Sequence, residues 1–325
     1  MNKYFAPNLL KAKNKYNKEI NFINKRSNTM SIINKFNLIK SVKRHFEISY
    51  LSIIKNYILD ENKNMKVKEK DSSISVSLSL LNMSMLAMLL DDNWKILDNA
   101  YPHIKLRGPN SEIIFCRTTV GYDFGHLVEI YVKKVYGSNF NGKNIIDVGM
   151  SNGDSSIFFA RNGAKRVIGL EPDKRSFNLA LKNITESQVD DIILPLNKAL
   201  SNQSGTIEMT VYNTTPNANS IDESNSVQIN DTKIKENIEA LRLGEVIDMF
   251  NSENIDLLKM DCEGCEYKVL ENMPEKYFSK ITKIYLEYHH GLQDIPEILN
   301  KHGFHVKVNE SSNIMGYIMA DRDVE

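Results

Sequence analysis

The chain has 325 residues and carries 41 Lys and Arg against 41 Asp and Glu, so its formal net charge at pH 7 is zero. This length allows one large domain or two ordinary ones. The three cysteines are an odd and small number, which argues against a secreted scaffold held together by disulfides. We expect Cys262 and Cys265 to be reduced packing residues, because no second cysteine pair exists to complete a zinc site.

Charge is unevenly distributed along the chain. Residues 1–70 carry 16 Lys and Arg against 5 Asp and Glu, so the rest of the chain is acidic and has no electrostatic bias toward nucleic acid. Apolar residues recur at a loose helical period over 36–59, which predicts a basic amphipathic helix. We interpret residues 1–98 as a helical or partly disordered extension in solvent. The alternative is an arm that contacts a membrane surface or a partner.

Residues 72–90 contain no charged side chain and are long enough to span a bilayer. Six serines and Asn82 dilute the segment, however, so a helix that packs against the protein is the better interpretation. Residues 1–30 show no signal-peptide pattern, and a cytoplasmic location is therefore expected.

From about Ile104 onward the pattern changes to strands and turns, with a predicted hairpin around Gly108 and a predicted helix over 124–136, and alternating strands and helices follow. Strands are expected near 144–148, 166–171, 191–196, 255–260 and 282–288, and helices near 154–162, 173–186, 265–272 and 294–302. This alternation predicts an α/β fold with a doubly wound, mostly parallel sheet. Residues 304–308 and 314–320 are expected to add a hairpin, whose last strand runs antiparallel and completes seven strands.

A glycine turn follows the first predicted strand of that sheet. The apolar run over 145–148 includes Asp147, and Gly149 and Gly153 flank the polar loop that leads into a helix. Glycines without a Cβ let the backbone turn sharply and approach a ligand closely. The second strand ends in Glu171, about 20 residues further on, where a carboxylate can accept the two hydroxyls of a ribose.

The spacing of the turn separates two cofactor classes. A dinucleotide fold needs a middle glycine against the pyrophosphate, and this turn lacks it. Asp147 would also repel a phosphate. S-adenosylmethionine has a ribose, no phosphate and two cationic groups, so an acid-rich site fits it better than NAD.

A second acidic segment lies near the chain's C-terminal third. The apolar run over 255–260 ends in Asp261 and Glu263, and in an open α/β sheet ligands bind outside the carboxyl ends of the strands. With Asp147 and Glu171, four carboxylates converge on that edge. Such a group is costly unless a cation is present, and the cofactor or a metal can supply one.

Taken together, the segments IIDVGMSNGDSS and KMDCEGCE resemble the FkbM family of S-adenosylmethionine-dependent methyltransferases. The resemblance covers roughly residues 104–321, and KMDCEGCE is its most specific part. Asn197 lies in a run similar to the family's third-strand region, which contacts adenine. Residues 219–221 look like its serine-rich loop, and residues 284–290, which include His289, look like its fifth strand. In the first loop, Ser151 would take the place of the family's asparagine.

The resemblance implies O-methylation of a sugar or other small-molecule or glycan hydroxyl by a class I methyltransferase domain at residues 99–325, with no nucleic acid as partner. The residues expected to bind the cofactor are Asp147, Gly149, Ser151, Gly153, Glu171, Asn197 and Asp261. Asp261, Glu263 and His289 are expected to be catalytic, because a hydroxyl is a poor nucleophile until a base takes its proton.

Two alternatives stay open at this point. The altered first loop would suit a non-catalytic module that binds the cofactor without turnover. The enzyme could also use a divalent metal that binds an acceptor diol through Asp261, Glu263 and Glu287, although no metal is assigned on sequence grounds.

Overall fold

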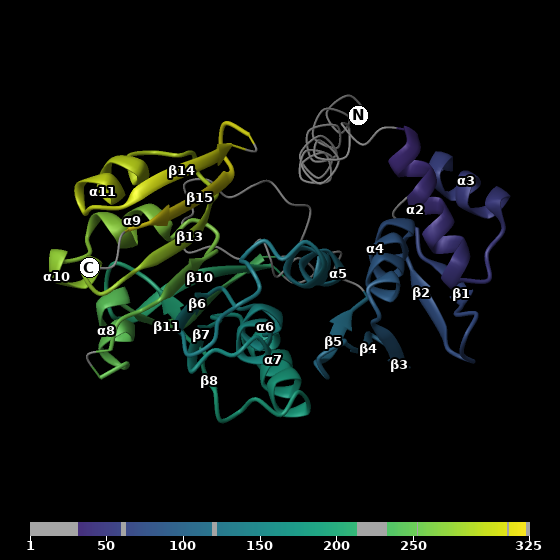
Figure 1. The fold of residues 1–325 in the computed structure, drawn as a ribbon, viewed down its shortest axis with the longest axis horizontal. Helices are drawn as coiled ribbons and strands as arrows, with labels where there is room; N and C mark the ends of the chain where they lie inside the picture. Colours follow the sequence, from purple (N-terminus) through teal and green to yellow (C-terminus); the bar gives the residue numbers. More distant parts are fainter. Residues whose placement is uncertain are drawn as a thin grey trace, which may run out of the picture.

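The computed structural model describes residues 32–59, 63–118, 122–212, 233–251, 253–310 and 312–322 (Figure 1). Residues 1–31 and the expected serine-rich loop at 219–221 lie outside these ranges. The described chain is built around a central seven-stranded sheet, and the elements that precede residue 133 contribute to the hydrophobic core on one of its faces.

The central sheet has the strand order β14-β15-β13-β12-β6-β7-β8. Its strands are β6 (Asn144–Val148), β7 (Arg166–Leu170), β8 (Ile193–Leu196), β12 (Leu257–Met260), β13 (Lys283–Tyr288), β14 (His305–Glu310) and β15 (Gly316–Asp321). The pairs among β8, β7, β6, β12 and β13 are parallel, and β15 runs antiparallel to both of its neighbours. The expected doubly wound sheet with a C-terminal antiparallel hairpin is therefore confirmed.

Helices cover both faces of this sheet. They are α6 (Asp154–Arg161), α7 (Lys174–Glu186), α8 (Leu243–Asp248), α9 (Glu266–Glu271), α10 (Glu275–Phe278) and α11 (Ile295–Lys301). Successive strand residues point to opposite faces. Thus Ile145 of β6 packs in one core with α6, whereas its neighbour Ile146 packs in a second core with α8, α9 and α11. The helix α7 begins where it does because the Asp173 carboxylate accepts the N–H of Ser176 at 2.8 Å.

A smaller antiparallel sheet precedes the central one. It consists of β3 (Lys95–Ala100), β4 (His103–Arg107) and β5 (Ile113–Arg117), and the expected hairpin around Gly108 is its β4–β5 pair. The helix α5 (Asp123–Leu127) follows and continues into a short π-helix, η1 (Val128–Val132), which ends earlier than the expected helix over 124–136. The expected domain boundary at residue 98 lies inside β3, so it divides a paired strand.

The segment over 72–90 is a strand followed by a buried helix. The strand β2 (Ser75–Leu78) pairs with β1 (Met65–Lys68), and α4 (Leu80–Asp91) is capped by the preceding Ser79, whose side chain accepts the N–H of Asn82. Most of α4 is buried, as the packing interpretation expected. Among the described residues, no helix is long and apolar enough to cross a membrane.

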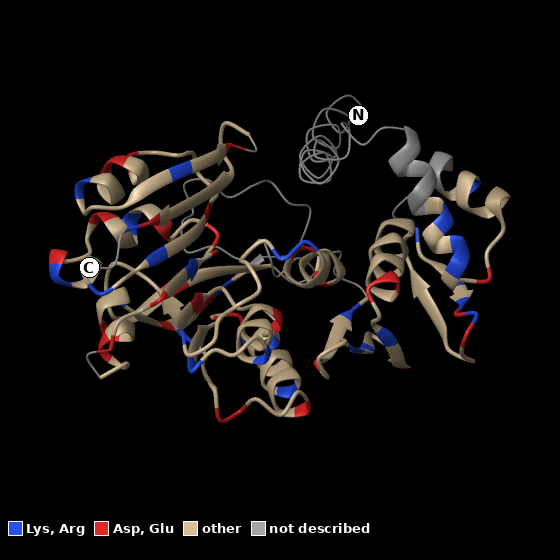
Figure 2. Ribbon diagram, in the orientation of Figure 1, with Lys and Arg blue, Asp and Glu red and all other residues tan. Residues whose placement is uncertain are grey.

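The predicted single helix over 36–59 is wrong, because the chain forms α2 (Ile32–His45) and α3 (Tyr50–Leu59) with a break between them. Figure 2 shows Lys and Arg along α2. One acid of α4 neutralises part of this charge: Asp91 accepts hydrogen bonds from Ser41, Arg44 and His45. The helix α2 is thereby docked against α4.

An antiparallel ribbon that the sequence did not predict lies between β9 (Ala199–Leu200) and α8. It pairs β10 (Gly205–Tyr212) with β11 (Lys233–Leu241), and β11 also pairs with β9. Much of β11 is exposed and charged, so it lacks the apolar run that marks a buried strand.

Candidate active site

The glycine turn after β6 lies directly against the end of β12. Gly149 has a φ of 73°, and a Cβ on it would lie 1.9 Å from the backbone oxygen of Asp261. Gly153 has a φ of 83° and precedes the first residue of α6. These two positions need glycine because the left-handed conformation is costly for other residues. The turn thus brings the two acidic segments together at one edge of the sheet.

Asp147 holds this turn from inside. Its side chain is fully buried, and it accepts hydrogen bonds of 2.6 Å from the hydroxyls of both Ser155 and Ser156. The buried Lys259 lies 3.2 Å from the Asp147 carboxylate and donates to the backbone oxygen of Gly149 at 2.7 Å. Asp147 therefore has no surface to offer a ligand. The expectation that it binds the cofactor directly is corrected to a positioning role.

Glu171 stands at the end of β7 beside the same turn. Its two carboxylate oxygens accept the N–H groups of Asp173 at 2.8 Å and of Ser151 at 3.0 Å. Burial raises the pKa of Glu171 to about 8, and these two N–H donors oppose only part of that rise. The side-chain amide of Asn197 donates to the backbone oxygens of Glu171 and Pro172, so it fixes the end of β7.

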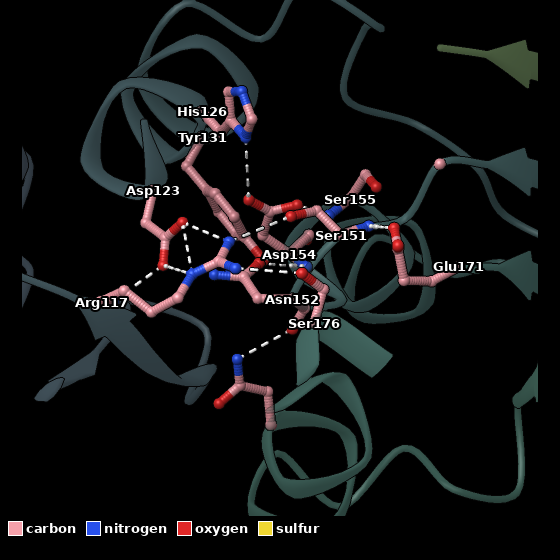
Figure 3. A network of polar contacts seen from close by, with 12 residues as sticks. Arg117, Asp123, His126, Tyr131, Ser151, Asn152, Asp154, Ser155, Glu171 and Ser176 are labelled. Atoms are coloured by element: carbon pink, nitrogen blue, oxygen red, sulfur yellow. Dashed lines mark hydrogen bonds and ion pairs between the residues drawn. The ribbon is translucent and has the colours of Figure 1, made fainter. Parts of the chain in front are cut away.

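A buried arginine that sequence reasoning missed reaches this turn from the smaller sheet (Figure 3). Arg117 ends β5, and its Nη2 lies 2.7 Å from Asp123 and donates to the Ser151 hydroxyl at 3.3 Å. Its Nη1 donates to the hydroxyl of Ser176, at the start of α7, at 3.0 Å. The one sequence signal for it is a charge that closes the apolar run over 113–116. Through Arg117, residues outside the central sheet help to shape the glycine turn.

A second polar group surrounds His289 at the ends of β12 and β13. The Nδ1 of His289 lies 3.2 Å from a carboxylate oxygen of Glu266, the first residue of α9. Its Nε2 lies 3.6 Å from Asp261, 3.6 Å from Glu263 and 4.0 Å from Glu287. The structure thus brings all three expected catalytic residues together and adds two acids, Glu266 and Glu287.

The charges around His289 decide its protonation in this arrangement. Burial alone lowers the pKa of an imidazole, but the carboxylates of Glu263, Glu266 and Glu287 outweigh it and raise the pKa of His289 well above its ordinary value. A protonated imidazole has no lone pair with which to take a proton. Without a bound metal ion, these carboxylates therefore favour the protonated form of His289, and its expected catalytic role stays a prediction.

Cys262 and Cys265 form a disulfide, so the expectation that they are reduced is wrong. Glu263 has a φ of 55° and Gly264 a φ of 115°, and this turn brings the two cysteine Cα atoms to 5.5 Å, a separation that a disulfide can bridge. A Cβ on Gly264 would lie 2.2 Å from the ring of His290. The turn that carries Glu263 is thus closed covalently on one side and covered by His290 on the other.

Comparison with known proteins identifies the region that contains these residues. Residues 147–306 match the family model of the methyltransferase FkbM domain. The chain is 22% identical over 168 residues to methyltransferase sdnD of Sordaria araneosa, a match that covers 44% of this chain and 65% of that protein. It thus spans less than two thirds of that relative's length.

Solved structures show weaker similarity. The FkbM methyltransferase of Methylobacillus flagellatus KT is 16% identical with a TM-score of 0.39, over 56% of this chain and 44% of that one. M. capricolum TrmK, in complex with S-adenosyl-homocysteine, is 12% identical with a TM-score of 0.36, over 59% and 67%.

The matched region starts at Asp147 and includes the glycine turn, Glu171 and the acids around His289. The strand order and the antiparallel β15 agree with the class I methyltransferase layout that the sequence predicted. Residues 147–306 of this chain therefore match the methyltransferase domain of the FkbM family.

Proposed function

We propose that this chain transfers the methyl group of S-adenosylmethionine to a hydroxyl of a sugar or another small-molecule or glycan acceptor. The observation that carries the proposal is the contact between Gly149 and the backbone of Asp261. This contact supports the proposal because it joins the ends of β6 and β7, where Glu171 can meet a ribose, to the ends of β12 and β13, where acidic side chains can meet an acceptor.

The residues at the first of these sites fit the cofactor. Each oxygen of Glu171 accepts one backbone N–H and keeps a lone pair that a ribose hydroxyl can use. Asp261 is about a quarter exposed beside the glycine turn and is placed to accept a cationic amino group. When bound, S-adenosylmethionine supplies a sulfonium methyl group that an oxygen nucleophile displaces in line.

The second site supplies what the acceptor needs. Asp261 and Glu263 are the more exposed carboxylates around His289, so they can meet a hydroxyl and accept its proton as the oxygen bonds to the methyl carbon. The His289 side chain is 8% exposed and lies 3.6 Å from each of these two carboxylates, so it helps to hold them in place. Positioning of the hydroxyl opposite the sulfur then supplies much of the rate.

The acceptor class rests on two features of the sequence. After β12 the chain reads Asp261-Cys262-Glu263-Gly264, without the Asp/Asn-Pro-Pro-aromatic motif of enzymes that methylate nucleic-acid bases. The chain beyond residue 70 is also acidic, which disfavours nucleic acid. Contact of the basic helix α2 with a membrane surface stays a prediction.

A labelling experiment tests the proposal. The full chain is incubated with methyl-labelled S-adenosylmethionine and a panel of monosaccharides, nucleotide sugars, polyols and RNA, and products are identified by mass spectrometry. We expect a methyl ether on a hydroxyl-bearing acceptor, and we expect Asp261→Asn to lower turnover about 100-fold. The exposed Glu275 offers a matched control, since Glu275→Gln removes the same charge away from the site. Methylation of RNA alone, or cofactor binding without transfer to any acceptor, would contradict the proposal.

A further inference from the structure

Three ligand atoms of different side chains converge near the ends of β12 and β13. One carboxylate oxygen each from Asp261 and Glu287 and a ring nitrogen of His289 all lie within 4.8 Å of one another. The side chains come from two neighbouring parallel strands and their loops, so the backbone of the central sheet fixes their spacing.

His289 provides an independent sign that something is held there. Its side chain is 8% exposed, and within the described part of the chain its Nε2 makes no hydrogen bond. That nitrogen instead faces Asp261, Glu263 and Glu287 at 3.6, 3.6 and 4.0 Å, which is too far for hydrogen bonds. A ring nitrogen of a largely buried side chain that faces three carboxylates across a gap of this size fits a cation shared among them.

The distances suit a cation of ordinary size. Ligands at about 2.1 Å from an octahedral ion are about 3.0 Å apart when adjacent and about 4.2 Å apart when opposite. The observed separations from Nε2 lie between these values. Glu266 completes the arrangement, because it lies at hydrogen-bond distance from Nδ1, where a carboxylate beside a metal-binding histidine usually lies.

We propose that Asp261, Glu287 and His289 bind a divalent cation of the Mn²⁺ type, with Glu263 beside them as a further oxygen ligand and Glu266 as the residue that orients His289. Carboxylates select Mg²⁺ and Mn²⁺, and an imidazole shifts the preference toward Mn²⁺. The role of the ion rests on the proposed function. The coordination positions of the ion that no side chain fills bind two adjacent oxygens of the acceptor. The acceptor is therefore a molecule with oxygens on neighbouring carbons.

The test measures binding of the metal alone. The full chain is treated with EDTA, dialysed and titrated with Mn²⁺, while the free ion is followed by its electron paramagnetic resonance signal. We expect one site per chain whose affinity for Mn²⁺ is far higher than that of the exposed acidic side chains. The midpoint of thermal unfolding should also rise when Mn²⁺ is added. Mg²⁺ should compete at higher concentration.

Variants assign the site. His289→Ala and Glu287→Gln should each weaken Mn²⁺ binding at least about tenfold, and Glu266→Gln should weaken it about 10–100-fold, as for other residues that orient a ligand. Glu275→Gln, an exposed acid on α10, should leave binding unchanged. The effect of Mn²⁺ on thermal unfolding is measured on the unaltered chain. It therefore tests the proposal even if a variant misfolds.

The outcomes separate this inference from the proposed function, because S-adenosylhomocysteine binding is measured in parallel on the metal-free chain. If the chain binds S-adenosylhomocysteine but has no tight Mn²⁺ site, the inference is overturned and the proposed function stands. The protonated His289 would then be the cation that balances the acids. Tight Mn²⁺ binding that survives in both His289→Ala and Glu287→Gln would overturn it too. Mn²⁺ binding at these residues without S-adenosylhomocysteine binding would support the site and contradict the proposed function.

Discussion

Gly149 and Asp261 touch through their backbones, although 111 residues separate them in the sequence: a Cβ on residue 149 would lie 1.9 Å from the Asp261 oxygen. Asp261 also donates its N–H to the backbone oxygen of Val148, the last residue of β6. Any side chain at position 149 would therefore push the loop after β12 away from the glycine turn. The cofactor and acceptor sites proposed above depend on this one contact.

We predict that Gly149→Ala abolishes S-adenosylhomocysteine binding and lowers the free energy of unfolding by clearly more than about 1 kcal/mol. Gly142→Ala is the matched control. Gly142 also has a positive φ, of 70°, but nothing lies within 4 Å of its Cβ position, so it tests the backbone strain without the clash. Urea unfolding and calorimetry compare the two variants. Equal effects of both would show that the contact with Asp261 is unimportant.

Arg117→Ala is expected to lower the free energy of unfolding by about 3–5 kcal/mol, because it leaves the buried Asp123 without its charged partner. Cofactor affinity should fall as well, since Arg117 also donates to the Ser151 hydroxyl. A double-mutant cycle with Asp123→Asn isolates the pair. If the two single losses simply add, Arg117 and Asp123 are not coupled and the network in Figure 3 has no energetic meaning.

Glu171 predicts a specific pH dependence of stability in the absence of cofactor. Its folded-state pKa of about 8 lies above its ordinary value of 4.5, so the folded chain keeps this proton to higher pH than the unfolded chain. The stabilising contribution is complete below about pH 4.5 and is lost as the pH rises through 8.

Glu171→Gln cannot release a proton, so the wild-type chain should lose stability relative to this variant as the pH rises from about 5 to about 8. Urea unfolding of both chains at several pH values measures the difference, with the exposed Glu275→Gln as the control. A difference that does not change with pH would show that Glu171 titrates near its ordinary value.

Removal of residues 1–98 should leave a chain that aggregates, contrary to a boundary at residue 98. Trp94 is 2% exposed and packs edge-on against Tyr131 at 4.9 Å, and both belong to the same core as Phe158 of α6. Trp94→Ala tests the same packing in the full chain and should cost about 3–5 kcal/mol. Size-exclusion chromatography and circular dichroism of the shortened chain check the prediction. A folded monomer with normal cofactor affinity would contradict it.

Buried parallel strands were predictable because each leaves a short apolar run in the sequence, as Ile145 and Ile146 do in β6. The turn glycines and the acids at strand ends were equally visible. The β10–β11 ribbon was not, since β11 is exposed and charged over much of its length. The helix predicted over 36–59 failed for another reason: periodicity does not mark a break that carries neither glycine nor proline.

Side-chain partners were the least predictable part of the site. The pattern showed that Asp147 belongs to the first strand but not that it faces Ser155, Ser156 and Lys259 inside the protein. Arg117 comes from a separate sheet, so no spacing in the sequence links it to Ser151. The pairing of Cys262 with Cys265 depends on the turn through Gly264, which a count of cysteines cannot reveal.

A calorimetric titration of the full chain with S-adenosylhomocysteine, beside one with NAD, tests the central claim most directly. We predict one S-adenosylhomocysteine bound per chain and no measurable NAD binding. In Glu171→Ala the binding should weaken by about 1–3 kcal/mol, because two ribose hydroxyls lose their hydrogen-bond acceptor. Tight NAD binding without S-adenosylhomocysteine binding would contradict the assignment of the cofactor and, with it, the proposed methyl transfer.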